Sequence, residues 1–456
     1  MGANRRRIIA DGKGDGSCKL WVPDSFDAKA YVKPIHADKL NIFVAHIFAG
    51  HLRGQEYRNA DSGVLRDVLG RYYRDHVLQP FMQHIGHRAT NYEVGSHAFG
   101  YALDDRFNDA SPVQVPIERR VTRERYLVSK ARAKAKLEAR LLPVHKQLRQ
   151  DQHCLGVWDM AEAIRRCDAA RAKTIAKQRA KGKERVGDYH RHRHIIDRVL
   201  RHDHSFTLGE CGRVFGTVTG LASGVRDVLT LNGQRCVQFD LKCSQPALLG
   251  YIMQTMAAGE MLPTIDYTPR QTLQHDGQAM YAWMAHKGLA DDVRAFIDVV
   301  TYRDGQDFYE LLQGEAGYPE GKAGRDAVKV DVLKYIINWR GDYTNPIRDA
   351  FGQAFPTVTG FIQRCASQYG HRCLIRTLQH VEAIVVLHRA VPAYKQLSNG
   401  APVLTLHDGV YVPQDNATEM WEALANTFSG MAYLPHVDRK NAWDASDDAD
   451  SGTGLG

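Results

Sequence analysis

The stretch that most constrains the fold runs from Arg235 to Gly250 and reads RCVQFDLKCSQPALLG. Its apolar run from Cys236 to Phe239 predicts a short buried strand, Asp240 ends that strand, and a helix follows. Pro246 fits the first turn of this helix, where a missing backbone N–H removes no hydrogen bond. A carboxylate at the end of a buried strand is shielded on its flanks and open at its tip, which suits it to hold a divalent metal ion.

A second carboxylate of this kind lies downstream in the stretch PVLTLHDGVYVP. Here His407, Asp408 and Gly409 stand between two apolar runs, which is typical of a hairpin with Asp408 at its bend. Two carboxylates on neighbouring strands, aimed at one point, are what a two-metal phosphoryl-transfer site requires. The pattern therefore predicts that Asp240 and Asp408 share a pair of divalent ions. The alternative is that both are ordinary capping or turn aspartates.

Length and composition predict a soluble globular chain of two to three domains, since its 456 residues are 44% hydrophobic and 25% charged. No apolar run is long enough to span a membrane and no signal peptide is visible, so we expect a cytoplasmic protein with no membrane partner. The eight cysteines are scattered without a C-x-x-C pair, which favours a reducing compartment without disulfides or structural zinc. Cys236 and Cys243 are expected to be small buried packing residues.

Positive charge is concentrated in one segment. Residues 119–201 contain 24 Lys and Arg against 9 Asp and Glu, a local charge of +15 that leaves −7 for the rest of a chain whose net charge is +8. A one-signed excess of this kind indicates a polyanionic partner, here nucleic acid, although a solvated helical face is the plainer alternative. A cluster of five histidines lies in and just after this segment: His190, His192, His194, His202 and His204. Alternating arginines would repel a metal ion, so we expect a phosphate-contacting or exposed surface there.

The chain divides into four predicted regions. Residues 1–110 form a mixed α/β region of unknown role, with helical patterns at 38–52 and 64–85 and strand-like alternation at 86–105. Residues 111–205 are a basic, mainly helical region that grips phosphates without reading bases. The polar tail, 446–456, is expected to be disordered. The remaining region, 206–445, carries the chemistry.

Within that region, a predicted helix at 323–338 carries Arg325 and Lys329. These residues are four positions apart, about 40° around the helix axis, and therefore lie on one face. A chain that joins nucleotides needs carboxylates for two metals and cations that neutralise an incoming triphosphate. This chain supplies the carboxylates with Asp240 and Asp408. It supplies the cations with Arg325 and Lys329, which lie between the two acids in the sequence.

The pieces in this order resemble the palm and fingers of family A DNA polymerases and of the single-subunit RNA polymerases of phages and mitochondria. The resemblance covers roughly residues 205–415 and rests on short motifs, each weak alone and more specific together. They are Gly212-Arg213-Val214-Phe215, Asp240-x-x-Cys243-Ser244 (or Ser244-Gln245 with two residues inserted), Gly305-Gln306-Asp307, Arg325-x-x-x-Lys329, Gln379-x-x-x-Ala383 and Leu406-His407-Asp408.

The resemblance implies a role for each matched residue. Asp240 and Asp408, with the carbonyl of Leu241, would bind two Mg²⁺ or Mn²⁺ ions. Arg325 and Lys329 would clamp the triphosphate, with Lys329 as catalytic proton donor to pyrophosphate. The remaining implied contacts are Tyr335 with the nucleotide, Arg213 and Gln379 with the template–primer duplex, and His407 with the primer end. The plainer alternatives are an exposed helix face for the two cations and ordinary surface or core positions for the rest.

The chain departs from the family pattern at several points. The family places a Tyr eight residues after the Lys, where this chain has Ile337; Tyr335 is six residues after it, about 120° away on a regular helix. Either the helix is locally irregular or Tyr335 is a core residue. The Glu with which the DNA enzymes exclude ribose is replaced by Ala247, which favours ribonucleotide use. No exonuclease carboxylate pattern and no promoter-reading region are visible.

These observations predict an α+β fold, with a right-hand polymerase-like palm and fingers preceded by a mainly helical basic region. The expected function is template-directed nucleotidyl transfer from nucleoside triphosphates, with a nucleic acid template and primer as partners. By analogy alone, the small size suggests a primase or replication polymerase of a phage or mobile element, acting in a bacterial or phage-infected cell. The alternatives are a catalytically inactive, polymerase-derived nucleic-acid-binding protein and a template-independent terminal transferase.

Overall fold

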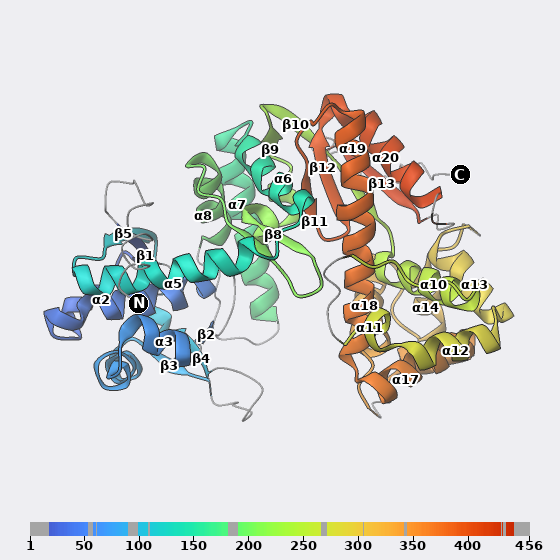
Figure 1. The fold of residues 1–456 in the computed structure, drawn as a ribbon, viewed down its shortest axis with the longest axis horizontal. Coiled ribbons are helices and arrows are strands. Elements are labelled where there is room, and N and C mark those ends of the chain that lie inside the picture. Colours follow the sequence, from blue (N-terminus) through green and yellow to red (C-terminus); the bar gives the residue numbers. More distant parts are fainter. Residues whose placement is uncertain are drawn as a thin grey trace. The chain divides into compact units, whose positions relative to one another are not determined.

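A computed structural model describes residues 18–52, 58–60, 62–89, 99–107, 110–180, 190–265, 271–303, 305–341, 344–429, 431 and 435–441 (Figure 1). The chain is divided into two compact units. The first comprises Met1–Arg140, Asp159–Asp203 and Thr217–Val228; the second comprises Leu141–Trp158, His204–Gly216 and Leu229–Gly456. The predicted basic region, 111–205, therefore contributes helices to both units. The predicted disordered tail lies outside the described residues.

The first unit packs helices on two small antiparallel sheets. Strand β1 (Lys19–Pro23) pairs with β5 (Pro112–Pro116), and β4 (Phe99–Leu103) lies between β2 (Arg58–Ala60) and β3 (Gly86–Arg88). The helices are α2 (Pro34–His51), α3 (Ser62–Leu69), α4 (Gln79–His84), α5 (Arg120–Glu138), α7 (Met160–Ala180), α8 (Arg191–Leu200) and α9 (Ser223–Arg226). The predicted helices at 38–52 and 64–85 are confirmed, as are strands at both ends of 86–105; residues 90–98 lie outside the described part.

The core of this unit is aromatic. Phe43, from α2, lies edge-to-face against Phe81 of α4 at a centroid distance of 4.9 Å and against Tyr101 of β4 at 5.2 Å. All three rings are buried, and edge-to-face pairs of this kind add to the free energy gained from burial alone.

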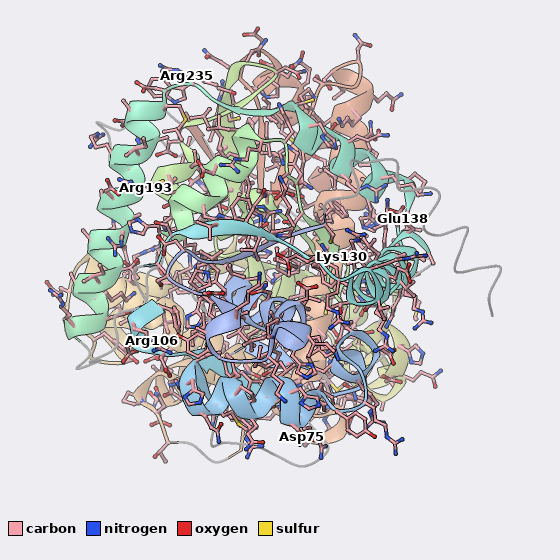
Figure 2. The ribbon with its side chains drawn as sticks, turned by 90° about the vertical axis from the view of Figure 1, so that its left-hand side faces the viewer. Asp75, Arg106, Lys130, Glu138, Arg193 and Arg235 are labelled. Carbon is pink, nitrogen blue, oxygen red and sulfur yellow. The ribbon has the colours of Figure 1, made fainter. Side chains whose placement is uncertain are left out.

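Helix α5 of the first unit is exposed on most of its circumference, and Thr122 is its one fully buried residue among those described. Its exposed cations include Arg125, Lys130, Lys134 and Lys136, and Lys130 projects from the helix in Figure 2. A helix that is polar all round is not held by an apolar stripe, so its cations remain accessible to a polyanion. The predicted helical character of the basic region is confirmed.

The expectation of an exposed histidine surface is wrong for two of the five histidines. His192 and His194 are 7% and 9% exposed and lie on the buried face of α8, together with Ile195 and Val199. The His194 ring packs edge-on against Trp21 at 5.4 Å, and burial lowers the pKa of this histidine to about 4. Uncharged imidazole packs as an apolar ring, which the alternation with arginine conceals in the sequence.

The second unit is built on one antiparallel sheet with the order β11-β12-β10-β9-β6 and β13 beside β10. The central strand, β10 (Gln234–Leu241), pairs with β12 (Gly409–Pro413) along one edge and with β13 (Val437–Asn441) along the other. The remaining strands are β6 (Leu155–Val157), β7 (Phe206–Leu208), β8 (Val214–Gly216), β9 (Leu229–Leu231) and β11 (Leu404–Leu406), of which β7 and β8 form a separate hairpin. A mixed α+β fold is confirmed.

Helices surround this sheet. They are α6 (Pro143–Asp151), α10 (Ser244–Ala257), α11 (Leu273–Asp276), α12 (Gln278–Lys287), α13 (Asp291–Val300), α14 (Phe308–Glu315), α15 (Lys322–Asp331), α16 (Pro346–Ala354), α17 (Pro356–Tyr369), α18 (Arg372–Ala383), α19 (Val391–Leu397) and α20 (Ala417–Ser429). Figure 1 shows α18 and α19 as one continuous column, which the π-helical segment Ile384–Ala390 joins. Helix α10 is buried on nearly every side, so the strand–carboxylate–helix stretch is anchored at its helical end.

A buried ion pair ties three elements of the second unit together. The Lys395 ammonium, on α19, lies 2.7 and 2.8 Å from the two carboxylate oxygens of Asp151, at the end of α6. One of these oxygens also accepts the backbone N–H of Val403, at 3.2 Å. The two side chains are 7% and 10% exposed, so neither charge can be hydrated if its partner is removed.

We therefore expect Asp151→Ala to lower the free energy of unfolding by about 3–5 kcal/mol, because it leaves the Lys395 charge buried and uncompensated. Urea denaturation of the purified chain measures this change. The double variant Asp151→Leu, Lys395→Met should recover most of the loss, since it removes both charges. A double variant as unstable as Asp151→Ala would contradict this account.

Candidate active site

Asp240 and Asp408 lie on neighbouring strands of the second unit. In the register between β10 and β12, Asp240 stands opposite Gly409, the residue that directly follows Asp408. A Cβ atom built on Gly409 would lie 3.3 Å from Oδ1 of Asp240, so the aspartate side chain lies directly over this glycine. The two acids are therefore brought to the same end of the same strand pair, although 168 positions separate them in the sequence.

The two carboxylates perturb each other and are only partly exposed. Burial, and then the charge of Asp408, raise the pKa of Asp240 to about 6. Burial, and then the charge of Glu382, raise the pKa of Asp408 to about 6. Lys329 opposes the shift at both acids. The two acids thus lie in a largely enclosed site beside further negative charge, which a bound divalent cation would offset.

Local structure explains the position of Asp408. The hairpin formed by β11 and β12 is closed by two residues, His407 and Asp408, and His407 adopts a positive φ of 58°. Two-residue hairpin loops favour turn types with a positive φ at their first position. Both flanking strands are buried along their whole length, so a shift in register would move apolar side chains out of the core. The predicted hairpin is confirmed.

The second neighbouring strand of β10, β13, also holds the strand end that carries Asp240. Strand β10 extends one residue beyond it, to Leu241, whose side chain is 4% exposed and which stands opposite Val437 of β13. Cys243 then adopts a positive φ of 51° at the start of α10 and is buried, as is Cys236. The predicted strand and helix and the packing role of the two cysteines are confirmed. Strand β13 was not predicted, because its sequence VDRKN has no apolar alternation and reads as a charged edge.

Glu382 is a third acid of the site that the sequence analysis did not single out. It lies on α18, is 1% exposed, and accepts a hydrogen bond from the Arg213 guanidinium at 2.7 Å and another from the Ser244 hydroxyl at 3.3 Å. Burial raises its pKa, and the charge of Asp240 acts in the same direction. A signal was present in the sequence, since a lone acid in the apolar run HVEAIVV must find a buried partner.

The cations of α15 differ in their surroundings. Arg325 donates to Asp307, the residue that caps the start of α14 by accepting the backbone N–H of Tyr309 at 2.8 Å. Burial alone would raise the pKa of Asp307, but the ion pair with Arg325 holds it below its ordinary value. Lys329 is exposed, lies 6.0 Å from the centroid of the Tyr309 ring, and makes no hydrogen bond or ion pair with any residue that the structure describes. Arg325 is thus engaged within the protein, whereas Lys329 is available to a ligand.

The helix that carries these cations is irregular where Tyr335 lies. Regular α-helix ends at Asp331 and a π-helical segment, Val332–Ile337, continues it. Tyr335 is half-buried, and its hydroxyl accepts a hydrogen bond from Lys334 at 2.8 Å. The first of the two alternatives for this helix, a local irregularity, is therefore present, and π-helical turns are frequent at functional sites.

The three residues expected to contact nucleic acid lie in different surroundings. Arg213, on the hairpin of β7 and β8, is 15% exposed and is bound to Glu382. Gln379 is half-buried on α18, one turn before Glu382. His407 lies in the carboxylate hairpin with its ring 5.3 Å from that of Phe215, which is 38% exposed. The pair formed by His407 and Phe215 thus places an accessible aromatic surface beside Asp408.

The donor set suits magnesium. Within the described ranges, no group of three or more His, Cys, Asp and Glu side chains is arranged to hold a metal ion. Mg²⁺ commonly takes one or two carboxylates from the protein and completes its shell with water and substrate phosphates. Asp240 and Asp408 are two carboxylates of this kind, and burial, followed by the charge of a neighbouring acid, raises the pKa of each. The residues therefore fit divalent ions that are bound together with a phosphate substrate.

Gly409 gives a direct test of whether the position of Asp240 matters. We expect Gly409→Ala to weaken the binding of Mn²⁺ by about 10-fold, because the new Cβ, 3.3 Å from the Asp240 carboxylate, displaces this ligand. Electron paramagnetic resonance of Mn²⁺ measures the effect. Gly360→Ala, on α17, is the matched control, since its Cβ meets nothing within 4 Å. Equal Mn²⁺ affinity of Gly409→Ala and the control would show that the carboxylate position is not critical.

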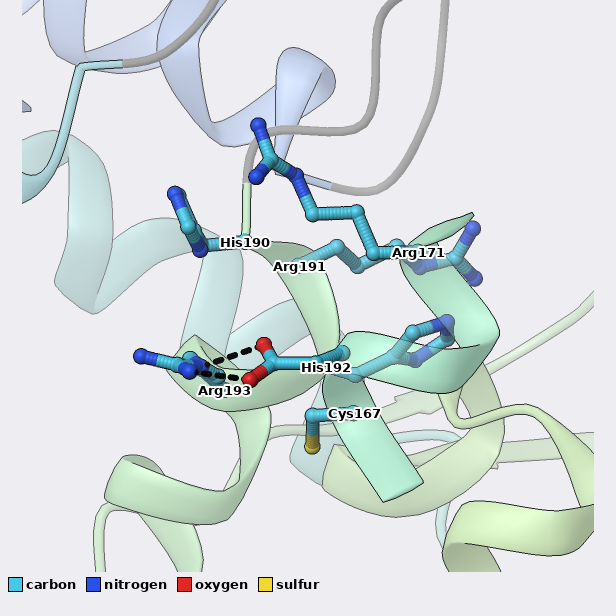
Figure 3. Close-up of a pocket in the computed structure, with 7 residues that line it drawn as sticks. Cys167, Arg171, His190, Arg191, His192 and Arg193 are labelled. Atoms are coloured by element: carbon cyan, nitrogen blue, oxygen red, sulfur yellow. Dashed lines mark hydrogen bonds and ion pairs between the residues drawn. The ribbon is translucent and has the colours of Figure 1, made fainter. Parts of the chain in front are cut away.

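A small basic pocket lies in the first unit, between α7 and α8 (Figure 3). Its lining consists of Cys167, Asp168, Arg171, His190, Arg191, His192 and Arg193. Arg193 donates to both oxygens of Asp168, so the charge of this arginine is neutralised within the protein. This pocket adds further positive charge to the first unit but brings together no catalytic set.

No protein-family model matches this chain, and a search of curated proteins gives no match either. No helix among the described residues is both long and apolar enough to cross a membrane. The function is therefore argued from the chemistry of the site.

Proposed function

We propose that this protein is a template-directed nucleotidyltransferase, a compact RNA or DNA polymerase that uses two divalent ions. The observation that carries the proposal is the meeting of Asp240 and Asp408 at one end of a strand pair, with Lys329 close enough to lower the pKa of both. Paired carboxylates beside an available cation suit a reaction in which a triphosphate must be held and its developing charge neutralised.

In this proposal each residue has a defined task. Asp240 and Asp408, with the Leu241 carbonyl, hold Mg²⁺ or Mn²⁺, and bound ions would activate the primer hydroxyl and stabilise the leaving pyrophosphate. Lys329 binds the triphosphate and gives a proton from its ammonium group to the pyrophosphate oxygen. Arg325 holds α15 on α14 through Asp307, and Tyr335, in the π-helical segment that continues α15, would contact the nucleotide.

The fold proposed for this chemistry is a right hand. The sheet centred on β10 and β12 is the palm, and α14 and α15 belong to the fingers. The support is the order of the elements, since the carboxylate strand, the cationic helix and the carboxylate hairpin follow one another as in the polymerases that the sequence resembles. The ion pair between Arg325 and Asp307 adds support, because it joins two of the resembling motifs in space.

Nucleic acid is the proposed partner of both units. The exposed cations of α5 and α7 are suited to phosphates, and contacts of this type fix the position of a duplex without reading its sequence. In the second unit, His407 and Gln379 are the proposed contacts with the primer end and the duplex. Arg213 is bound to Glu382, so its proposed contribution to the duplex is through the hairpin that it anchors.

A primer-extension assay tests the function. Purified protein is incubated with a primed template, with rNTPs or dNTPs, and with Mg²⁺ or Mn²⁺, and wild type is compared with Asp408→Ala. Template-dependent products from wild type and none from Asp408→Ala are expected. Products that need no template would identify a terminal transferase. If the protein binds nucleic acid but forms no product with any pairing of nucleotide and metal ion, its function is nucleic-acid binding alone.

Phe215 provides a test of the proposed primer site. We expect Phe215→Ala to weaken the binding of a primed template by about 10-fold, since stacking of one base on an aromatic ring contributes roughly 1–3 kcal/mol. Fluorescence anisotropy of a labelled primer–template, at one fixed salt concentration, measures the affinity. Phe215→Tyr is the control and should bind like wild type. Loss of affinity in both variants would point to packing against His407 rather than to base stacking.

A further inference from the structure

We infer that Glu382 is a positioning residue that connects the turn after Asp240 to the hairpin turn of Asp408 and holds the two carboxylates in place for divalent ions. This inference rests on the proposed function. It concerns a residue that belongs to none of the matched motif positions. Its basis is a chain of contacts within the second unit that leads from one buried carboxylate to both acids of the site.

The side chain of Glu382 is enclosed and only partly satisfied. One oxygen, Oε2, accepts both the Arg213 and Ser244 hydrogen bonds, at 2.7 and 3.3 Å. The other, Oε1, is buried and has no hydrogen-bond partner among the residues that the structure describes. A buried carboxylate oxygen without a donor is costly, so its retention calls for a compensating role.

The first arm of the contact chain leads to Asp240. Ser244 is the first residue of α10 and follows Asp240 by four positions, across the turn in which Cys243 has a positive φ. The hydrogen bond from the Ser244 hydroxyl to Glu382 therefore fixes the helical end of the turn that follows Asp240.

The second arm leads to Asp408. Arg213 lies two residues before Phe215, whose ring packs against His407, the residue that precedes Asp408 in the hairpin turn. The ion pair of Arg213 with Glu382 holds β8, and β8 in turn supports the hairpin through this ring contact. The Glu382 carboxylate thus contacts, through Ser244, the turn that follows Asp240 and, through Arg213 and β8, the hairpin that carries Asp408.

The place of Glu382 in its helix supports a functional role. Regular α-helix ends one residue after it, at Ala383, and the π-helical segment Ile384–Ala390 begins there. Such segments often occur beside functional residues, because the extra residue in the turn changes the direction in which neighbouring side chains project. The charge of Glu382 also acts on both Asp240 and Asp408, so the contact chain and the electrostatics join the same three acids.

The test uses the full-length chain, with Mn²⁺ as the probe, and follows Mn²⁺ binding by electron paramagnetic resonance alongside primer extension. Glu382→Gln is expected to weaken Mn²⁺ binding by about 10–100-fold and to lower kcat with little change in the KM for nucleotide, the range typical for groups that orient metal ligands. Asp151→Asn is the matched control. It breaks a second buried ion pair of the same unit that is not joined to the acids, and should bind Mn²⁺ like wild type once folded.

Arg213 separates positioning from simple destabilisation. If Arg213 and Glu382 act as one unit, Arg213→Gln and the double variant Arg213→Gln, Glu382→Gln should weaken Mn²⁺ binding no more than Glu382→Gln alone. The double variant also removes both charges, so it replaces the single variant if Glu382→Gln does not fold. Wild-type Mn²⁺ affinity and kcat in the folded Glu382 variants would overturn the inference.

The outcomes distinguish this inference from the proposed function. If wild type makes no polymer but binds Mn²⁺ through Asp408, and Glu382→Gln weakens that binding, the positioning role stands and the polymerase proposal fails. If wild type is active and Glu382→Gln is equally active, the positioning role fails and the polymerase proposal stands. If wild type shows no binding of Mn²⁺ that depends on Asp408, both fail.

Discussion

Replacing Asp408 with Asn is expected to lower nucleotidyl transfer by about 10²–10³-fold, and at the same time to raise the melting temperature of the metal-free protein at pH 8. The loss of activity is in the range for removal of one preorganised electrostatic contact to a reacting group. The gain in stability arises because the ionised Asp408 carboxylate is enclosed by burial and lies beside the charges of Glu382 and Asp240 when no cation is bound. Asn keeps the shape of the side chain and removes its charge.

The pH dependence of this gain has a definite sign. Folding raises the pKa of both acids from the ordinary value of 3.8 to about 6, so the folded state holds protons that the unfolded state has released. Their contribution to stability is therefore fully present below about pH 4 and is lost as the pH rises through about 6. The stabilisation by Asp408→Asn should appear above pH 6 and disappear toward pH 4.

Calorimetry of wild type and Asp408→Asn at pH 4.5 and pH 8, with EDTA or with Mg²⁺, measures these effects. At pH 8 with EDTA we expect a rise of about 2–4 °C, the shift for about 1 kcal/mol in a domain of roughly 250 residues. Mg²⁺ should raise the melting temperature of wild type and leave that of Asp408→Asn nearly unchanged. Asp326→Asn, an exposed acid of α15, is the control and should show neither effect.

The reading of Asp408 as an ordinary turn residue makes the opposite prediction. A turn aspartate stabilises the native hairpin through its local hydrogen bonds, so its replacement would lower stability at both pH values. A lower melting temperature for Asp408→Asn at pH 8 would therefore remove the physical basis for the metal site.

Replacing Lys329 with Met is expected to lower the rate of nucleotide addition by about 10²–10⁴-fold, the contribution of a positioned general acid. Lys329 is exposed and bound to no other described residue by a hydrogen bond or ion pair, so the free energy of unfolding should change by less than about 0.5 kcal/mol. The combination of a large kinetic effect with unchanged stability is the signature of a residue that acts on the substrate.

Single-turnover rates at saturating nucleotide separate the two parts of the Lys329 effect. Lys329→Arg keeps the positive charge but gives up its proton poorly, so we expect nucleotide affinity to be retained while the rate remains low. Lys287→Met, at an exposed lysine at the end of α12, is the control and should be close to wild type. A wild-type rate for Lys329→Met would show that Lys329 is an ordinary exposed lysine of α15 with no role in the reaction.

Arg325 shows how far a pattern alone can mislead about the state of a residue. Its spacing from Lys329 correctly places both side chains near one face of the helix. The structure adds that Arg325 is paired with Asp307, a partner eighteen positions away that also caps α14. Spacing on a helix reports direction, whereas availability to a ligand depends on what the neighbouring elements bring to the same place.

The sequence by itself determined the two elements that carry the acids. An apolar run that ends in Asp240, and two apolar runs that flank a two-residue turn at Asp408, are local patterns whose physics is set by nearest neighbours, and strand, helix and hairpin follow from them. Several helices of both units are determined in the same way by apolar spacing, whereas α5 follows from the helix propensity of its residues. Such patterns do not determine which distant residues each element contacts in the folded chain.

Tertiary structure alone decided which distant residues share the site. It buried Glu382 against Arg213, which is 169 positions away, turned His192 and His194 into core side chains, and added the charged strand β13 beside Asp240. In each case a polar residue is buried or paired by an element that is remote in the sequence. Hydrophobic periodicity reports which face of an element is covered, but the identity of the covering side chains, and so the charge in the site, is set only when the chain packs.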